Sequence, residues 1–147
     1  MADIRTKYSD LYLKERKNFL WPTEFVVRAL LGKNYEFGDR SKTNAALDLG
    51  FGDGRNLELL TSLYTNVYGL EISEAICQEA SAWFPNVEFL TGYSHDIASA
   101  DSFFDLVLAA HSIYYCDFSG IEKNFAEVNR VLRESGRFVF SILKRNS

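Results

Sequence analysis

Three alternating glycines, Gly50, Gly52 and Gly54, follow the short apolar run 45–49. Glycine lets the backbone approach a ligand closely, because no β-carbon stands in the way. A helix is expected to begin near Arg55, and it would direct free amide N–H groups and the positive end of its dipole at this loop. We therefore interpret 50–54 as a loop that binds a ligand through its backbone.

An acidic residue, Glu71, ends the next apolar run, 66–70. A carboxylate at the tip of this second strand can accept hydrogen bonds from both hydroxyls of a ribose. A dinucleotide-binding loop would have its third glycine at position 55, which is Arg55 here. This argues against a nicotinamide dinucleotide and favours a smaller nucleoside. A glycine loop alone would be an ordinary turn, but strand, loop, helix and acidic residue together predict nucleoside binding.

The elements that must position these residues alternate along the chain. Apolar runs predict strands and helical spacing predicts helices, which gives strands at 45–49, 66–70, 87–90, 104–110 and 137–143 and helices at 55–64, 73–84 and 121–133. This alternation predicts an α/β fold, a doubly wound, mainly parallel Rossmann-like sheet of about five strands. Ligands of such sheets bind outside the carboxyl ends of the strands, where the glycine loop and Glu71 are expected.

Several segments resemble the class I S-adenosylmethionine-dependent methyltransferases. Residues 47–54, LDLGFGDG, are similar to the first motif of that family, and residues 68–73, YGLEIS, are similar to the second. Weaker similarity extends the match to roughly residues 45 to 143. The resemblance implies S-adenosylmethionine as cofactor, with Glu71 on the ribose, Ile72 against adenine and the glycine loop around the methionine portion.

The predicted cofactor site departs from the family pattern at one position. The family usually has an aspartate at the position of Tyr93, where it binds the adenine amino group. Tyr93 cannot act as that carboxylate, so either a backbone group or Ser94 replaces it or adenine is held more loosely. The complete set of predicted cofactor contacts is Asp48, Gly50, Phe51, Gly52, Gly54, Asn56, Glu71, Ile72, Tyr93, Ser94 and His111.

Methyl transfer itself needs few catalytic groups. A sulfonium methyl group is a strong electrophile, so the main task is to hold the acceptor in line and exclude water. A general base is needed only if the acceptor must lose a proton. His111, after the run 104–110, and Tyr114 are the candidates for such a role, but we expect His111 to contact the cofactor rather than move a proton. The catalytic residue is therefore left open.

Residues 1–44 are interpreted as a helical segment ahead of the cofactor-binding core at 45–147. Helices are expected at 9–19 and from Pro22 to about Leu31, and this segment either forms a lid over the site or packs on the sheet. The family normally has seven strands, whereas this chain stops after the fifth, so the last two are expected to be missing. Truncation is the preferred explanation, over a minimal enzyme or a domain completed by another chain. The apolar strand at 137–143 would then offer an edge for self-association.

Composition restricts the remaining possibilities. The chain has 147 residues, of which 16 are Lys or Arg and 20 are Asp or Glu, and this predicts one globular domain with a net charge of −4. We find no basic block typical of nucleic-acid binding, no apolar run of about 20 residues that could span a membrane, and no cysteine pattern typical of a metal site. We expect a cytoplasmic methyltransferase that acts on a small molecule; the alternative is a non-catalytic S-adenosylmethionine-binding or interaction module of the same fold.

Overall fold

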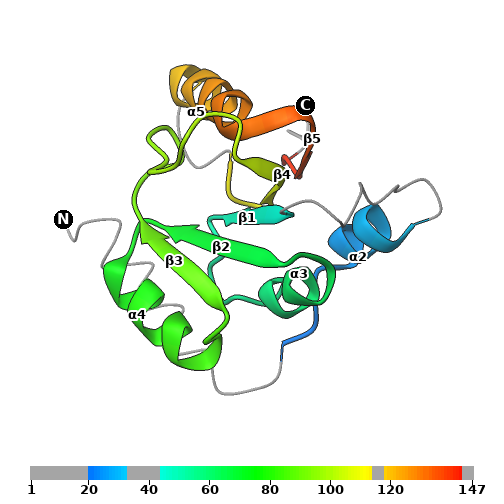
Figure 1. Ribbon diagram of the computed structural model, residues 1–147. Coiled ribbons are helices and arrows are strands. Elements are labelled where there is room, and N and C mark those ends of the chain that lie inside the picture. Colours follow the sequence, from blue (N-terminus) through cyan, green and yellow to red (C-terminus); the bar gives the residue numbers. More distant parts are fainter. Residues whose placement is uncertain (1–19, 33–43, 114–117, 144–147) are drawn as a thin grey trace.

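The computed structural model describes residues 20–32, 44–113 and 118–143 (Figure 1). The helix predicted at 9–19 and the candidate Tyr114 lie outside these residues. The described helices are α2 (Glu24–Leu31), α3 (Leu57–Leu63), α4 (Glu74–Trp83) and α5 (Phe118–Val131). The strands are β1 (Ala45–Leu49), β2 (Asn66–Glu71), β3 (Val87–Thr91), β4 (Phe104–Ala109) and β5 (Leu132–Phe140).

The five strands form one sheet in the order β3-β2-β1-β4-β5, and every neighbouring pair is parallel. The prediction of a doubly wound, Rossmann-like sheet is therefore confirmed. The chain runs from β1 through β2 to the β3 edge, and then returns to place β4 on the other side of β1. Because the strand order reverses between β1 and β4, the carboxyl ends of these strands border the crevice where such sheets bind ligands.

Helices cover both faces of the sheet (Figure 1). Alternate residues of a strand point to opposite faces. On β1, Ala46 belongs to the core formed with α2, α3 and α4, whereas Leu47 belongs to the core formed with α5. On β4, Leu106 and Val107 divide between the same two cores. Burial on both faces explains why these strands are continuous apolar runs rather than alternating ones.

The amino-terminal segment is attached to the first of these cores through α2. Val26 and Leu30 are completely buried there, because they lie four residues apart on one face of the helix. The helix begins at Glu24 with Thr23 at the N-cap position. Pro22 was predicted to lie in the first turn and instead precedes the cap, so the predicted start was two residues early.

The boundary between α4 and β3 resolves an ambiguity in the sequence. Helical spacing allows either Trp83 or Phe84 on the inner face of the helix; Trp83 is 64% exposed, whereas Phe84 packs against the core. At the other end of α4, Ser73 accepts a hydrogen bond from the Ile76 amide at 3.3 Å, which caps the helix.

The last helix and strand differ in their bounds from the prediction. Both elements begin earlier than expected, since α5 was predicted at 121–133 and the final strand at 137–143. β5 ends at Phe140, which pairs with Ala109. Since Ala109 is the last residue of β4, the two strands end together.

The Ser–Gly pair at 135–136, which is typical of a turn, forms an irregularity within β5. Ser135 has a φ of 68°, and the pairing with β4 shifts between Leu132 and Arg137. Pairing on both sides of this irregularity allows the strand to begin directly after α5, which the sequence pattern did not indicate.

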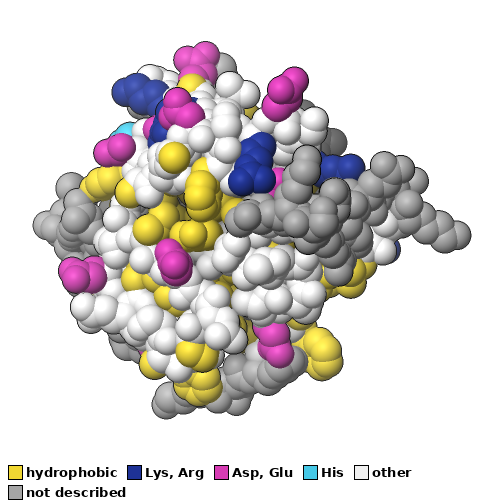
Figure 2. Space-filling model, viewed as in Figure 1, with side chains coloured by type: hydrophobic (Ala, Val, Ile, Leu, Met, Phe, Trp, Pro, Cys, Tyr) yellow, Lys and Arg dark blue, Asp and Glu magenta, His cyan; other side chains and the backbone are white. Residues whose placement is uncertain are grey.

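Among the described residues on the face seen in Figure 2, charged side chains of both signs are scattered and form no basic patch. None of the helices in the described ranges has the length and apolar character needed to cross a membrane.

Candidate functional site

A cavity of about 600 Å³ lies at the carboxyl ends of the strands. Its walls come from the segments after β1, β2, β3 and β4, together with the start of α2 and the first half of α5. The lining residues are Thr23, Asp48, Gly50, Phe51, Gly52, Asp53, Arg55, Asn56, Leu70, Glu71, Ile72, Gly92, Tyr93, Ser94, His95, Ala110, His111, Ser112, Gly120 and Asn124. A volume of this size is typical of small-molecule and cofactor sites.

The glycine loop after β1 requires glycine for its backbone conformation. Gly50, Gly52 and Gly54 have φ values of 70°, 56° and 78°, in the left-handed region that other residues rarely adopt. Space is a second constraint at Gly50, where a β-carbon would lie 2.5 Å from Cβ of Ser112. The loop is therefore held against the segment after β4, and Gly54 turns the chain without lining the cavity.

Glu71 joins the loop to the end of β2. Its Oε2 atom accepts a hydrogen bond from the Gly52 amide at 3.1 Å, and its Oε1 atom accepts one from the Ile72 amide at 2.9 Å. Burial raises the pKa of this carboxyl, and the two backbone hydrogen bonds oppose that rise. Each carboxylate oxygen can accept more than one hydrogen bond, so both keep capacity for hydroxyl groups of a ligand.

Asp48, at the end of β1, is the most perturbed ionisable group of the site. It is 1% exposed, and its Oδ2 atom is the buried side-chain oxygen or nitrogen that lacks a hydrogen-bond partner within the described ranges. Burial, and then the negative charges of Glu71 and Asp53, raise its pKa from 3.8 to about 8. An unsatisfied carboxyl oxygen on a cavity wall is stabilised by a ligand that brings a cation or a hydrogen-bond donor.

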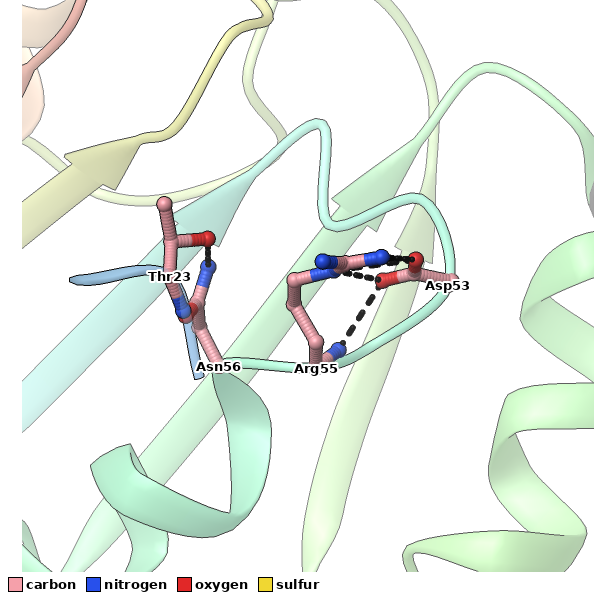
Figure 3. A network of polar contacts seen from close by, with 4 residues as sticks. All are labelled: Thr23, Asp53, Arg55 and Asn56. Carbon is pink, nitrogen blue, oxygen red and sulfur yellow. Dashed lines mark hydrogen bonds and ion pairs between the residues drawn. The ribbon is translucent and has the colours of Figure 1, made fainter. Parts of the chain in front are cut away.

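Two polar pairs fix the chain where it enters α3 (Figure 3). The Thr23 amide donates to Oδ1 of Asn56 at 2.9 Å, and Nδ2 of Asn56 donates to Oγ1 of Thr23 at 3.3 Å. Asp53 and Arg55 form an ion pair at 2.6 Å on the loop itself. Asn56 therefore lines the cavity but directs both ends of its amide group to Thr23, which connects α2 to the loop.

The wall after β3 is aromatic. The rings of Tyr93 and His95 stack with their centroids 5.1 Å apart and an angle of 24° between their planes. The Asp96 amide donates to the Tyr93 carbonyl at 3.1 Å and closes this turn. Tyr93, Ser94 and Ile72 all line the cavity, so its β3 end offers rings, a hydroxyl and an aliphatic side chain.

The wall after β4 is centred on His111, whose φ of 55° is unusual for a residue other than glycine. Oγ of Ser141, just beyond β5, lies 2.8 Å from the His111 amide nitrogen and 3.1 Å from Nδ1 of its ring. Phe25 of α2 meets the same ring edge-on, with centroids 5.7 Å apart. Ser112 next to it donates its hydroxyl to the Leu49 carbonyl at 2.6 Å.

The structure brings ten of the eleven predicted cofactor contacts to one cavity, and the eleventh, Gly54, shapes the loop behind it. The sequence did not indicate Thr23, Ser112 or Asn124 as site residues. His95, which the sequence offers only as a weaker candidate on an outer loop, also lines the cavity. Ser112 follows a strand end directly and could have been found by that criterion. Thr23 caps α2 and Asn124 lies on α5, and no local signal marks either residue.

The family model of the methyltransferase domain matches residues 47–140 of the chain. This chain belongs to the methyltransferase domain family. The match includes the glycine loop, Glu71 and the β4 end of the cavity, and the sheet supports the class I S-adenosylmethionine-dependent type.

Individual relatives match different shares of this methyltransferase domain. The uncharacterized methyltransferase YcgJ of Bacillus subtilis is 26% identical over 98 residues, which are 63% of this chain and 38% of that protein. The PH0226 protein of Pyrococcus horikoshii has a TM-score of 0.66 and 29% identity, over 79% of this chain and 56% of its own. A chain of the complex between the Haloferax volcanii Trm112 methyltransferase activator and its methyltransferase partner has a TM-score of 0.73 and 24% identity. The match covers 92% of this chain and 58% of that chain. The domain thus spans less than two thirds of the length of each of these proteins.

The arrangement can bind an elongated ligand across the switch point of the sheet. Aromatic and aliphatic groups lie at the β3 end, paired hydrogen-bond acceptors at β2, an unsatisfied carboxyl at β1, and a positioned imidazole at β4. Within the described ranges, no group of three or more His, Cys, Asp or Glu residues could hold a metal ion.

Proposed function

We propose that this methyltransferase domain binds S-adenosylmethionine and transfers its methyl group to a small-molecule acceptor. The observation that carries the proposal is the position of Glu71, which shares one cavity wall with the glycine loop and hydrogen-bonds to it. A carboxylate that is both oriented by backbone amides and open to a cavity is suited to hold the two hydroxyls of a ribose.

The other predicted contacts follow from that anchor. With the ribose at β2, adenine lies towards β3, between Ile72 and the stacked rings of Tyr93 and His95. Ser94 supplies the hydroxyl near the position where the family usually has an aspartate. This subsite holds adenine through its faces more than through a carboxylate bond to its amino group.

The methionine portion lies over the glycine loop towards β4. Its ammonium group fits the unsatisfied Oδ2 of Asp48, because a cation beside that oxygen removes the cost of burying it. A bound ammonium favours the charged form of Asp48 and lowers its pKa, so binding near neutral pH releases a proton.

The cofactor supplies an electrophilic methyl group, and the residues of this domain bind, orient and exclude water. The segment that precedes the core contributes Thr23 to the cavity wall and Val26 and Leu30 to the core. In this proposal the segment both packs on the sheet and closes one side of the site. A small-molecule acceptor enters at the β4 end, where His111 and Asn124 line the cavity.

Isothermal titration with S-adenosylhomocysteine tests cofactor binding. We expect the wild type to bind, and Glu71→Ala to weaken binding about 100-fold, which corresponds to the loss of two hydrogen bonds to a charged group. Glu88→Ala is the matched control, because Glu88 is an exposed glutamate on the next strand, and its affinity should equal that of the wild type. A folded wild type that binds no S-adenosylhomocysteine, or a Glu71→Ala variant of undiminished affinity, contradicts the proposal.

Methyl release from labelled S-adenosylmethionine across a panel of small acceptors tests catalysis. Transfer to one class of acceptor is expected. Cofactor binding without transfer to any acceptor in the full-length protein would instead identify the chain as a binding module of the same fold.

A further inference from the structure

His111 is held by three separate elements. It follows β4, its backbone and ring both contact Ser141 beyond β5, and its ring meets Phe25 of α2. The Ser141 amide also donates to the Ala109 carbonyl at 3.2 Å, so the serine is fixed by the same ladder that ends β4. Strained backbone such as the left-handed conformation of His111 persists only where the surroundings maintain it. Because both the amide and the ring of His111 are fixed as well, its side chain is held in one position.

The contacts of Ser141 determine which ring nitrogen is left for a ligand. Its Oγ atom accepts the hydrogen bond of the His111 amide, and it lies 3.1 Å from Nδ1. A serine hydroxyl has one proton to donate, and donating it to Nδ1 gives Oγ one hydrogen bond in each role, since it already accepts from the His111 amide. When Oγ donates to Nδ1, the neutral ring carries its own proton on Nε2. The imidazole then offers a donor to the cavity and has no free nitrogen lone pair with which to accept a proton.

The position of His111 along the cavity indicates what that donor meets. In the sheet register Asp48 pairs with Leu108, three residues before His111, so the two cavity-lining side chains lie at neighbouring strand ends. An amino-acid tail carries its ammonium and its carboxylate on the same carbon. If the ammonium binds Asp48, the carboxylate on the same carbon lies close by, and a hydrogen-bond donor at the neighbouring β4 strand end can reach it.

Two other described polar side chains at the β4 end already donate within the protein. Ser112 donates to the Leu49 carbonyl, and Asn124 donates to the Ile113 carbonyl at 3.2 Å. Nε2 of His111 is directed away from the Ser141 contact by the geometry of the ring.

We propose that Ser141 is a positioning residue that holds His111 in its Nε2–H form, and that His111 binds the carboxylate of the amino-acid tail of the cofactor. The inference rests on the proposed function, and it assigns His111 to ligand binding rather than to proton transfer from the methyl acceptor.

Nitrogen-15 NMR of the histidine rings tests the Nε2–H form directly. The chain has two histidines, and the His111 signals are assigned by their loss in His111→Asn. At a pH where the ring is neutral, we expect a pyridine-type Nδ1 and a pyrrole-type Nε2 for His111. Ser141→Ala should shift both nitrogens towards the average of the two tautomers, Ser141→Thr should restore them, and the His95 signals should not change. A pyrrole-type Nδ1, or shifts that are the same in wild type and Ser141→Ala, overturns the proposal.

Titration with two ligands tests the carboxylate contact. S-adenosylhomocysteine has the amino-acid tail, and methylthioadenosine lacks it. We expect only the first to shift Nε2 of His111, and His111→Gly to weaken its binding about tenfold while leaving methylthioadenosine unaffected. Equal responses to both ligands, or no response to bound S-adenosylhomocysteine, overturn the contact. Failure of the wild type to bind S-adenosylhomocysteine in calorimetry would instead remove the proposed function, so the two failures are distinguishable.

Discussion

The two halves of the cavity are built in different ways. On the β1–β2 side, the backbone of 50–54 and the carboxyls of Asp48 and Glu71 come from one strand–loop–helix–strand unit. On the β4–β5 side, His111 depends on Ser141 and on Phe25, which are far from it in sequence.

Strain is also distributed differently between the halves. The β1–β2 loop reaches its left-handed conformations with glycines, whereas the β4 side forces His111 into one, at about 1–2 kcal/mol. The first half is thus pre-formed by residue type, and the second by tertiary contacts. Substitutions should therefore act on the first half through backbone and charge, and on the second through side-chain support.

The largest effect is expected from Gly50→Ala. The new β-carbon would lie 2.5 Å from Cβ of Ser112, and φ would remain at 70°, so we expect a loss of about 3 kcal/mol in the free energy of unfolding. Urea denaturation measures this loss. Gly92→Ala is the control in the same cavity, because its β-carbon would meet nothing closer than 3.7 Å. Equal losses in the two variants would show that stability does not depend on the close approach of Gly50 to Ser112.

Asp48→Asn should separate stability from binding. The pKa of the Asp48 carboxyl is about 8 in the folded protein, whereas it is near the ordinary value of 3.8 in the unfolded chain. Between these values the native state binds more protons, so wild-type stability falls as pH rises. The amide removes that slope, so the variant becomes more stable than the wild type as pH rises towards 8, with no gain at pH 4.

Thermal unfolding of wild type and Asp48→Asn across pH 4 to 8 measures this difference, and calorimetry should show weaker S-adenosylhomocysteine binding by the variant. Asp96→Asn is the control, because Asp96 is exposed and outside the cavity lining. A wild-type stability that rises with pH over this range, or an unchanged slope in Asp48→Asn, would contradict the role of the buried carboxyl.

The two halves also differ in how much of their geometry the sequence indicates. The loop and Glu71 are recognisable because residue type and short spacing determine them: glycine is required by φ, and an acidic strand tip follows at once. The support of His111 by Ser141 joins the ends of two paired strands, and no local pattern encodes that pairing. The early start of β5 was missed for a similar reason, since pairing with β4 overrides the turn signal of Ser135 and Gly136.

Asn56→Ala tests the connection between the two halves of the cavity. Asn56 joins the glycine loop to the start of α2, and Phe25 of the same helix contacts His111. Asn56 is buried and exchanges two hydrogen bonds with Thr23, so its loss should cost about 1.5 kcal/mol and loosen α2 from the loop. Arg55→Ala, which removes the more exposed ion pair with Asp53, is the comparison and should cost at most about 1 kcal/mol. Hydrogen exchange of the α2 amides should accelerate in Asn56→Ala alone; acceleration in both would mean that the whole loop supports the helix.

The smallest effect, and the finest test of the comparison, is expected from His111→Gly. Glycine accepts the φ of 55° without strain but costs more backbone entropy, so we expect a net gain of about 0.5 kcal/mol in stability. Ser135→Gly removes a similar strain, at a φ of 68°, outside the cavity lining and should give a similar gain. Only His111→Gly should weaken S-adenosylhomocysteine binding, because only there does the strained residue face the ligand. If His111→Gly instead lost stability, the contacts of the imidazole with Phe25 and Ser141 would outweigh the backbone strain. The main role of the imidazole would then be to stabilise the fold rather than to bind the ligand.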